Sequence, residues 1–184
     1  MESITQLLRA SREGRPEALA ALFDATYPEL RSIARRRLAK DDRGTLLDTT
    51  SLVHECFLKL AGHEHLELED RRHFLAYATT TMRTIVVDFA RARVAARRGG
   101  GAARVTLDSV VLDAMPAGED EVLAVNEALD DLAELDPRLA QVVEMRYFGG
   151  LSDAEIAEAL DLGIRTVRRD WAKARLVLAA SLRG

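Results

Sequence analysis

The sequence predicts an all-α protein, and its composition and its apolar spacing both favour that class. Of its 184 residues only 5% are aromatic and four are prolines, whereas Ala, Leu and Arg are abundant. This balance is typical of helices that pack along aliphatic seams. Apolar residues recur at helical spacing along most of the chain, and no segment shows the alternation expected of a strand. The apolar content of 48% is that of a globular protein.

The N-terminal part is predicted to be a bundle of four or five helices. Apolar residues recur at helical spacing in 4–8, 19–23 and 30–38. Pro16 and Pro28 are expected to mark helix starts, because proline is tolerated in a first turn. Two further helices are predicted at 52–61 and 71–98. Together these segments form a predicted domain at 1–98.

A linker is predicted at 99–120. Three consecutive glycines, Gly99 to Gly101, interrupt the helical pattern, and Pro116, Gly118 and acidic residues follow. A second domain is then expected at 121–184. It begins with a helix at 122–135 and another that opens at Asp136-Pro137 and ends before two glycines.

The segment 151–182 is predicted to form a helix-turn-helix. Ser152 and Glu155 have the spacing of a capping box at the start of the first helix. A short turn follows at 161–163, and Val167 and Trp171 continue the inner face on the second helix. This motif predicts a protein that binds duplex DNA and is not an enzyme.

The outer face of the second helix is basic although the chain carries a net charge of −4. That net charge argues against indiscriminate nucleic-acid binding, so DNA contacts must come from local patches. The predicted contacts are Arg165, Thr166, Arg168, Arg169 and Lys173. A solvated amphipathic hairpin is the alternative, but it does not explain this concentration of positive charge. Asp170 either pairs with a neighbouring arginine or accepts a hydrogen bond from cytosine N4.

Other chemistry is not expected. The lone cysteine, Cys56, cannot form an internal disulfide, and neither a signal peptide nor a membrane span is recognisable, so we expect a cytoplasmic protein without membrane contact. His54 and Cys56 point about 200° apart on a helix, which disfavours a shared metal ion. The glycines at 99–101 lack the Lys-Ser/Thr of a phosphate loop. We therefore expect neither a metal nor a cofactor.

Two longer segments point to a known family. The segment 51–60 (SLVHECFLKL) resembles the region of small bacterial sigma factors that docks on core RNA polymerase, and 138–152 (RLAQVVEMRYFGGLS) resembles the lead-in to their promoter-binding motif. With the long basic helix, the linker and the helix-turn-helix in the same order, nearly the whole chain resembles the extracytoplasmic-function (ECF) sigma factors of the sigma-70 family. The segment 167–171 (VRRDW) is similar to one subgroup in particular.

This resemblance implies a sigma region 2-like domain that binds polymerase and opens the −10 element. It also implies a region 4-like domain that reads the −35 element as duplex. The implied partners are promoter DNA and core RNA polymerase, through its beta-prime clamp and beta flap. The residues implied at the −10 element are Tyr77, Arg83, Thr84, Asp88, Arg91 and Arg93, and those implied in polymerase docking are Asp48, Leu52, Glu55, Phe57 and Leu58.

The match at the −10 residues is incomplete. Arg83 and Asp88 fit the family's Arg-Asn…Asp pattern, but Thr84 stands where Asn is usual and Tyr77 where Trp is usual. Tyr77 offers a ring on which a base can stack. Core packing is the alternative for this ring, and it is the favoured interpretation for Phe74 and Ile85.

The chain departs from the family just ahead of the docking helix. Typical members carry Asp-Ala-Glu-Asp, whereas this chain has Asp48 followed by Thr49, Thr50 and Ser51. The unmodified protein should therefore dock weakly. Phosphorylation of Thr50 or Ser51, with Thr49 as a further candidate, would add about −1.5 to −2 charge at a helix N-terminus and implies a Ser/Thr kinase as a partner. The compatible alternative is an ordinary N-cap, which contributes about 1 kcal/mol.

Two other functions fit parts of the sequence. A helix-turn-helix regulator that acts without polymerase would need a dimerisation helix, for which 122–135 could serve, but it leaves the docking resemblance unexplained. A helical partner-binding protein, such as an antagonist of a sigma factor, would lack the basic face that Arg165, Arg168 and Arg169 provide.

Overall fold

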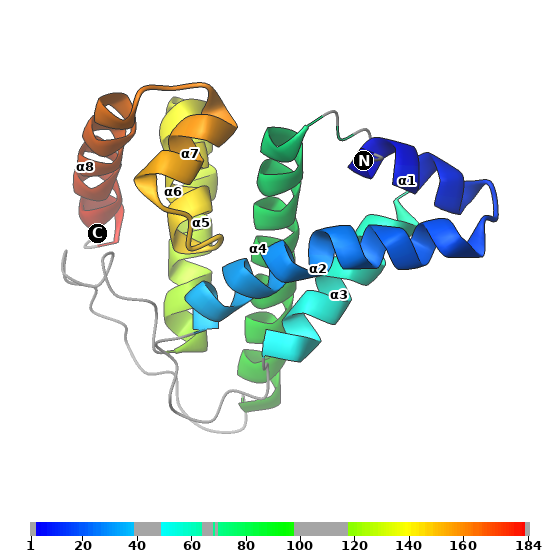
Figure 1. Ribbon diagram of the computed structural model, residues 1–184. Helices are drawn as coiled ribbons and strands as arrows, with labels where there is room; N and C mark the ends of the chain where they lie inside the picture. Colours follow the sequence, from blue (N-terminus) through cyan, green and yellow to red (C-terminus); the bar gives the residue numbers. More distant parts are fainter. Residues whose placement is uncertain (1–2, 39–48, 64–67, 69, 98–117, 183–184) are drawn as a thin grey trace.

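The computed structural model describes residues 3–38, 49–63, 68, 70–97 and 118–182, and every regular element in these ranges is a helix. The all-α prediction is therefore confirmed. The helices are α1 (Ile4–Arg12), α2 (Pro16–Leu38), α3 (Thr49–Gly62), α4 (Arg71–Arg97), α5 (Glu119–Leu135), α6 (Pro137–Tyr147), α7 (Asp153–Leu160) and α8 (Ile164–Ser181) (Figure 1). None of the described helices has the length and apolar character needed to cross a membrane.

Side-chain caps define several helix starts. At α7 the predicted capping box is present, since Ser152 Oγ accepts from the backbone N–H of Glu155 at 3.3 Å and Glu155 Oε2 accepts from the backbone N–H of Ser152 at 2.8 Å. At α4, Asp70 Oδ1 accepts from the backbone N–H groups of Arg72 and His73 at 2.9 and 3.1 Å. These caps satisfy donors that a helix start would otherwise leave unpaired.

Helix α2 continues through Pro28, so the expectation that a new helix begins there is wrong. The proline removes one backbone hydrogen bond, at a cost of about 3 kcal/mol. Leu22 before it and Leu30 and Ile33 after it are all buried on one face. Burying each such side chain contributes roughly 1.5–3 kcal/mol, which outweighs the loss.

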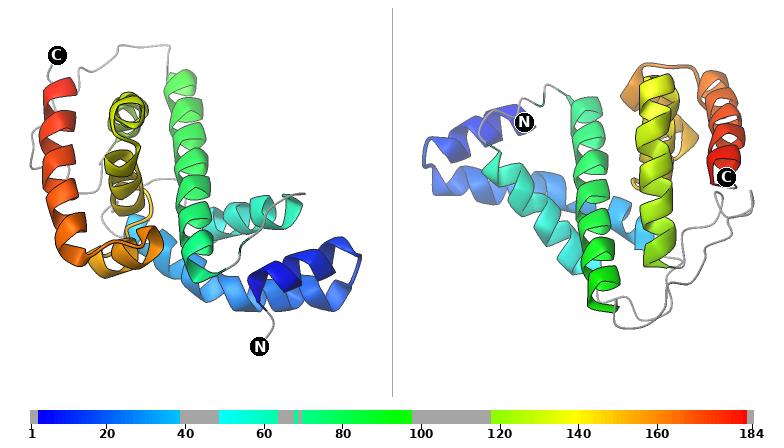
Figure 2. Two further views of the ribbon diagram at one scale, coloured as in Figure 1. Left: turned by 90° about the horizontal axis from the view of Figure 1, so that it is seen from above. Right: turned by 180° about the vertical axis from the view of Figure 1, so that it is seen from behind.

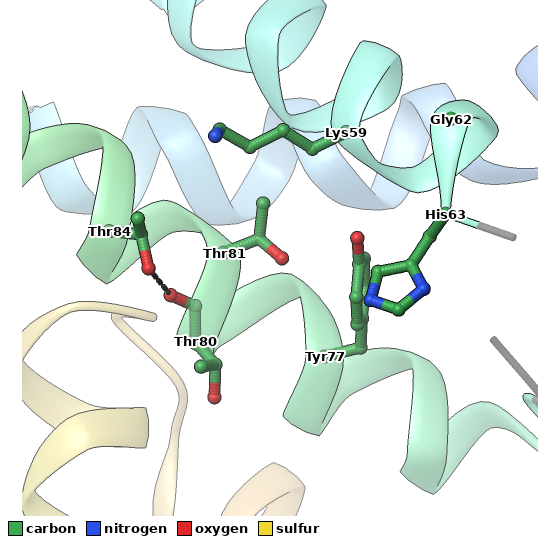
Figure 3. Close-up of a pocket in the computed structure, with 7 residues that line it drawn as sticks. All are labelled: Lys59, Gly62, His63, Tyr77, Thr80, Thr81 and Thr84. Atoms are coloured by element: carbon green, nitrogen blue, oxygen red, sulfur yellow. Dashed lines mark hydrogen bonds between the residues drawn. The ribbon is translucent and has the colours of Figure 1, made fainter. Parts of the chain in front are cut away.

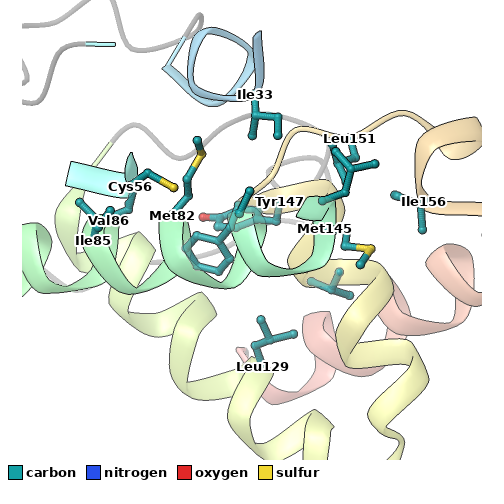
Figure 4. Packing of buried hydrophobic residues seen from close by; sticks show 14 of the residues in the cluster. Ile33, Cys56, Met82, Ile85, Val86, Leu129, Met145, Tyr147, Leu151 and Ile156 are labelled. Carbon is teal, nitrogen blue, oxygen red and sulfur yellow. The ribbon is translucent and has the colours of Figure 1, made fainter. Parts of the chain in front are cut away.

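Helix α4 lies at the centre of the molecule, between α1–α3 and α5–α8 (Figures 1 and 2). It packs on α3 from one side and on α5, α6 and α7 from the other. One core cluster therefore includes residues of both predicted domains, among them Ile33, Met82, Tyr147 and Leu151 (Figure 4). The sequence predicted two domains but not this shared face, and most of the predicted linker lies outside the described residues.

Gly149 allows the turn after α6 to approach α4 closely. A Cβ atom at this position would lie 2.6 Å from Thr79 Oγ1 and 2.7 Å from the backbone oxygen of Met145. The preceding residue, Phe148, is fully buried in the core. Gly149 therefore also sets how closely the turn packs on α4.

Candidate nucleic-acid interface

Helices α7 and α8 form a helix-turn-helix with a buried inner face. Ile156 of α7 and Val167 and Trp171 of α8 are buried against one another and the rest of the core. Between the helices, Asp161 adopts a left-handed conformation with φ of 54°, which Asp tolerates better than most residues. The packing fixes which side of α8 faces solvent.

The solvent-facing side of α8 carries the predicted basic residues. Arg165, Arg168, Arg169 and Lys173 are all exposed, and Thr166 is half-buried. Ion pairs link three of them to carboxylates, two beside α8 and one within it: Arg168 Nε to Asp153 at 2.9 Å, Lys173 Nζ to Asp136 at 3.4 Å and Arg169 Nε to Asp170 of α8 at 3.7 Å. The Lys173–Asp136 pair is the most exposed of the three and contributes at most about 1 kcal/mol, so a phosphate can replace it.

Asp170 lies under this face rather than on it. Its side chain is 3% exposed, and its Oδ2 lies 2.7 Å from Nε of Arg138, at the start of α6. A second contact, from Arg138 Nη2 to Asp170 Oδ1, is 3.3 Å long. The buried carboxylate thus pairs with arginines and is not placed to contact a cytosine. It attaches α8 to α6.

Asp153, the first residue of α7, forms ion pairs with two arginines. Arg146 pairs with its Oδ1 and Arg168 donates to its Oδ2. Burial tends to raise the pKa of the Asp153 carboxyl, but the hydrogen bonds from Arg168 and Arg146 outweigh burial and lower it overall. Arg146 also lies over the Trp171 ring, 4.8 Å from its centroid, which is a cation–π geometry.

The residues implied at the −10 element lie on two different faces of α4. Positions 77, 84, 88 and 91 fall within about 60° of one another on a helix, whereas 83 and 93 point about 120° or more away from 77. Thr84, Asp88 and Arg91 are exposed and Tyr77 is half-buried. On the other face, Arg93 Nε lies 2.5 Å from Glu119 of α5.

Arg83 is held by the C-terminal helices. Its Nε donates to Asn126 Oδ1 at 2.9 Å and its Nη2 to Asp130 Oδ1 at 2.5 Å, while Glu144 lies 3.6 Å from Nη1. The guanidinium also sits over the Phe148 ring at 5.7 Å, and the side chain is only 17% exposed. Burial raises the pKa of Glu144, and Arg83 partly offsets this shift. The structure therefore places Arg83 in the contact between α4 and α5–α6, not on an open surface.

A cavity of about 430 Å³ opens between α3 and α4 on the Tyr77 face (Figure 3). The Tyr77 ring meets His63 edge to face, with ring centroids 6.0 Å apart. The residues that line the cavity are Lys59, Gly62, His63, Tyr77, Thr80, Thr81 and Thr84. Sequence reasoning found Tyr77 and Thr84 but missed the others. The spacing 77, 80, 81, 84 along one helix face would have indicated the two additional threonines.

The alternative of core packing holds for the neighbours of this cavity. Phe74 and Met82 are almost fully buried, and Ile85 is 8% exposed. Tyr77 differs from them, because it is half-buried and borders the cavity.

The predicted docking residues of α3 do not share one surface. Leu52 is fully buried in the core, whereas Glu55 is exposed and Leu58 is 62% exposed. Phe57 is half-buried, with its ring edge-on to Phe23 at 5.0 Å. Asp48 lies outside the described residues. Leu52 therefore offers no contact surface in this structure.

The start of α3 carries the phosphorylation candidates. Thr50 and Ser51 are exposed in its first turn, which contains no acidic residue. Thr49 begins the helix, and its side chain lies outside the described set.

Burial raises the pKa of the Cys56 thiol, in the middle of α3, to about 12. Within the described ranges, no group of three His, Cys, Asp or Glu side chains could hold a metal ion.

Comparison with known proteins assigns the family. Residues 1–184 match the model of the family described as "ECF sigma factor". The chain belongs to the ECF sigma factor family. It is also 30% identical over 172 residues to "ECF RNA polymerase sigma factor SigK" of Mycobacterium ulcerans (strain Agy99), an alignment that covers 91% of this chain and 87% of that relative. As an ECF sigma factor, the chain is an RNA polymerase-binding factor for promoter-specific transcription initiation.

Proposed function

We propose that this ECF sigma factor reads its promoter with two separate surfaces. The exposed basic face of α8 enters the major groove of the −35 element, and the cavity between α3 and α4 receives an unpaired base of the −10 element. The exposure of Arg165, Arg168 and Arg169 on one side of a helix whose other side is buried carries the first part. This is how the second helix of a helix-turn-helix approaches DNA.

The chemistry of the cavity supports the second part. The Tyr77 ring supplies a stacking surface, and the threonine hydroxyls can donate to or accept from base edges. Lys59 at the rim can meet a backbone phosphate. An extruded base loses stacking worth a few kcal/mol, which a pocket of this kind can offset. Arg91 extends the same exposed face along α4.

The closed arrangement must open on the promoter. The names of the −10 and −35 elements give positions about 25 base pairs apart, which is roughly 85 Å at 3.4 Å per base pair. A compact chain of this length has a radius of gyration of about 16 Å. One compact body is too small to contact both elements, so we infer that α5–α7 separate from α4 when the promoter is bound.

Docking on polymerase would use the exposed part of α3, with Glu55 and Leu58. A phosphate on Thr50 or Ser51 would add negative charge to a helix start that has no acidic residue in its first turn. A Ser/Thr kinase would then control docking. The phosphate would supply the negative charge that typical members obtain from an acidic cluster in their sequence.

Run-off transcription with core polymerase tests the promoter-reading proposal. Arg165→Ala should abolish most of the run-off transcript, because it removes a groove-facing cation and so weakens promoter binding. Arg15→Ala removes the same charge from the exposed end of the N-terminal bundle and should have little effect. Equal loss in both variants would contradict a reading role for α8.

Polymerase affinity tests the docking and phosphorylation proposals. Thr50→Glu and Ser51→Asp should raise affinity for core polymerase above that of the unmodified protein, and Thr50→Ala should not. If neither acidic variant nor kinase treatment raises it, the phosphorylation proposal is wrong. Failure of every form to bind polymerase would contradict docking through α3.

A further inference from the structure

A chain of contacts connects the buried and exposed faces of α8 through Asp153. The guanidinium of Arg146, on α6, lies over the ring of the buried Trp171 and pairs with Asp153 Oδ1. The other carboxylate oxygen, Oδ2, accepts from Nε of Arg168 at 2.9 Å. These contacts begin on the inner side of α8, pass through α6 and α7, and end on its outer side. The direction of Arg168 is thus coupled to the packed core of the motif.

The atom that Arg168 uses in this pair matters. Its side chain is 69% exposed while that of Asp153 is 20% exposed. Because Nε makes the hydrogen bond, the Nη1 and Nη2 groups lie outside it, and these are donors that can fork onto guanine O6 and N7. Lys173 differs, because its 3.4 Å contact with Asp136 involves an ammonium group with no planar fork to orient.

We propose that Asp153 is a positioning residue for −35 recognition, holding Arg168 with its terminal donors toward the groove. The inference rests on the proposed reading of the −35 element by α8. A side chain that is already ordered loses less freedom when it binds. The charge of Asp153 also offsets the attraction of Arg168 to phosphates of any sequence. Asp153 therefore raises selectivity rather than overall affinity.

Binding measurements on the full chain test this role, because the basic face of α8 is exposed without any rearrangement. The wild-type protein is first used to select duplexes from a library with a randomised central segment. The enriched duplex is the specific probe and the unselected library is the non-specific probe. Fluorescence anisotropy then gives both affinities for each variant over a range of salt concentrations.

Asp153→Asn should lower the ratio of specific to non-specific affinity roughly two- to tenfold. Its affinity for the unselected library should stay equal or rise. The slope of log affinity against log salt concentration should become steeper by about one, as for one additional phosphate contact. Asp161→Asn is the matched control, since it removes the same charge from the other end of α7 and Asn tolerates the left-handed backbone there. This control should keep the wild-type ratio.

A double-mutant cycle separates positioning from simple stabilisation. In an Arg168→Lys background, Asp153→Asn should cause no further loss of selectivity, because the planar group is already gone. If Asp153→Asn lowers the specific and the non-specific affinity in parallel, the residue is only structural and the inference is overturned. The same holds if Asp153→Asn lowers selectivity as much in the Arg168→Lys background as in the wild type. If the wild type selects a sequence and Asp153→Asn keeps its selectivity, the positioning role alone fails. If the wild type selects no sequence, the −35 proposal itself fails.

Discussion

Arg83 offers the most direct test of the contact between α4 and the C-terminal helices. The resemblance to sigma factors implies that Arg83 contacts −10 DNA, whereas the structure places it against Asn126, Asp130 and Glu144. Arg83→Ala should therefore open the molecule. Asp130→Asn should have the same effect to a smaller degree, although Asp130 lies on α5 and is not implied at the −10 element.

The size of each effect follows from the contacts. Hydrogen bonds that involve a charged group contribute about 1.5–3 kcal/mol, and Asp130 is 64% exposed, so its own pair contributes only about 0.5–1 kcal/mol. Arg83→Ala should then weaken the closed form by roughly 2–4 kcal/mol and Asp130→Asn by roughly 0.5–1 kcal/mol. At tenfold per 1.4 kcal/mol, the closed-to-open ratio falls about 30- to 700-fold and about two- to fivefold.

Small-angle X-ray scattering measures the opening directly. The compact wild-type chain should have a radius of gyration of about 16 Å. This value should rise in Arg83→Ala and should rise by less in Asp130→Asn. Asp131→Asn is the control, because it removes the same charge from the next, exposed position on α5. If Arg83→Ala weakens promoter binding and leaves the radius of gyration unchanged, Arg83 contacts DNA and the reasoning from the interface is refuted.

Three further predictions concern buried groups. Arg138→Ala should destabilise the protein by about 3–5 kcal/mol, because it leaves the Asp170 carboxylate buried without its main partner, and by more than Asp170→Asn, which leaves a half-exposed arginine to water; urea titration that shows the reverse order would contradict this. Burial raises the pKa of Glu144, so the contribution of this carboxyl to stability should be present in acid and be lost as pH rises through its folded-state pKa. Glu144→Gln should remove this dependence from the unfolding midpoint, and an unchanged pH profile would count against it. Cys56 should resist thiol reagents at neutral pH until urea unfolds the protein, since its pKa is raised to about 12; rapid labelling of the native protein would be inconsistent with its burial.

Local features of the fold could be predicted from the sequence, because their causes are local. The capping box of Ser152 and Glu155 and the exposed basic face of α8 depend on neighbours within one or two helical turns. The continuation of α2 through Pro28 could not be predicted, because the burial that stabilises the helix on both sides of it comes from tertiary packing. The resemblance implies Arg83 at the −10 element, and its contact with Asn126 could not be predicted because the two residues are 43 positions apart in the chain. The cavity was only half found, since Lys59 comes from a different helix.

Helix α4 packs on α5–α7 in the closed form and contacts the −10 element in our proposal, and these two roles have a consequence for genetics. In the proposed mechanism, promoter output depends on the fraction of molecules in which α4 is released, because apparent affinity scales with the population of the binding-competent form. A screen for altered promoter strength should therefore recover substitutions at Asn126 and Asp130, on a helix that touches no promoter base in our proposal. Their phenotype would extend to every promoter equally, whereas a substitution on the exposed face of α8 would change which promoters are used.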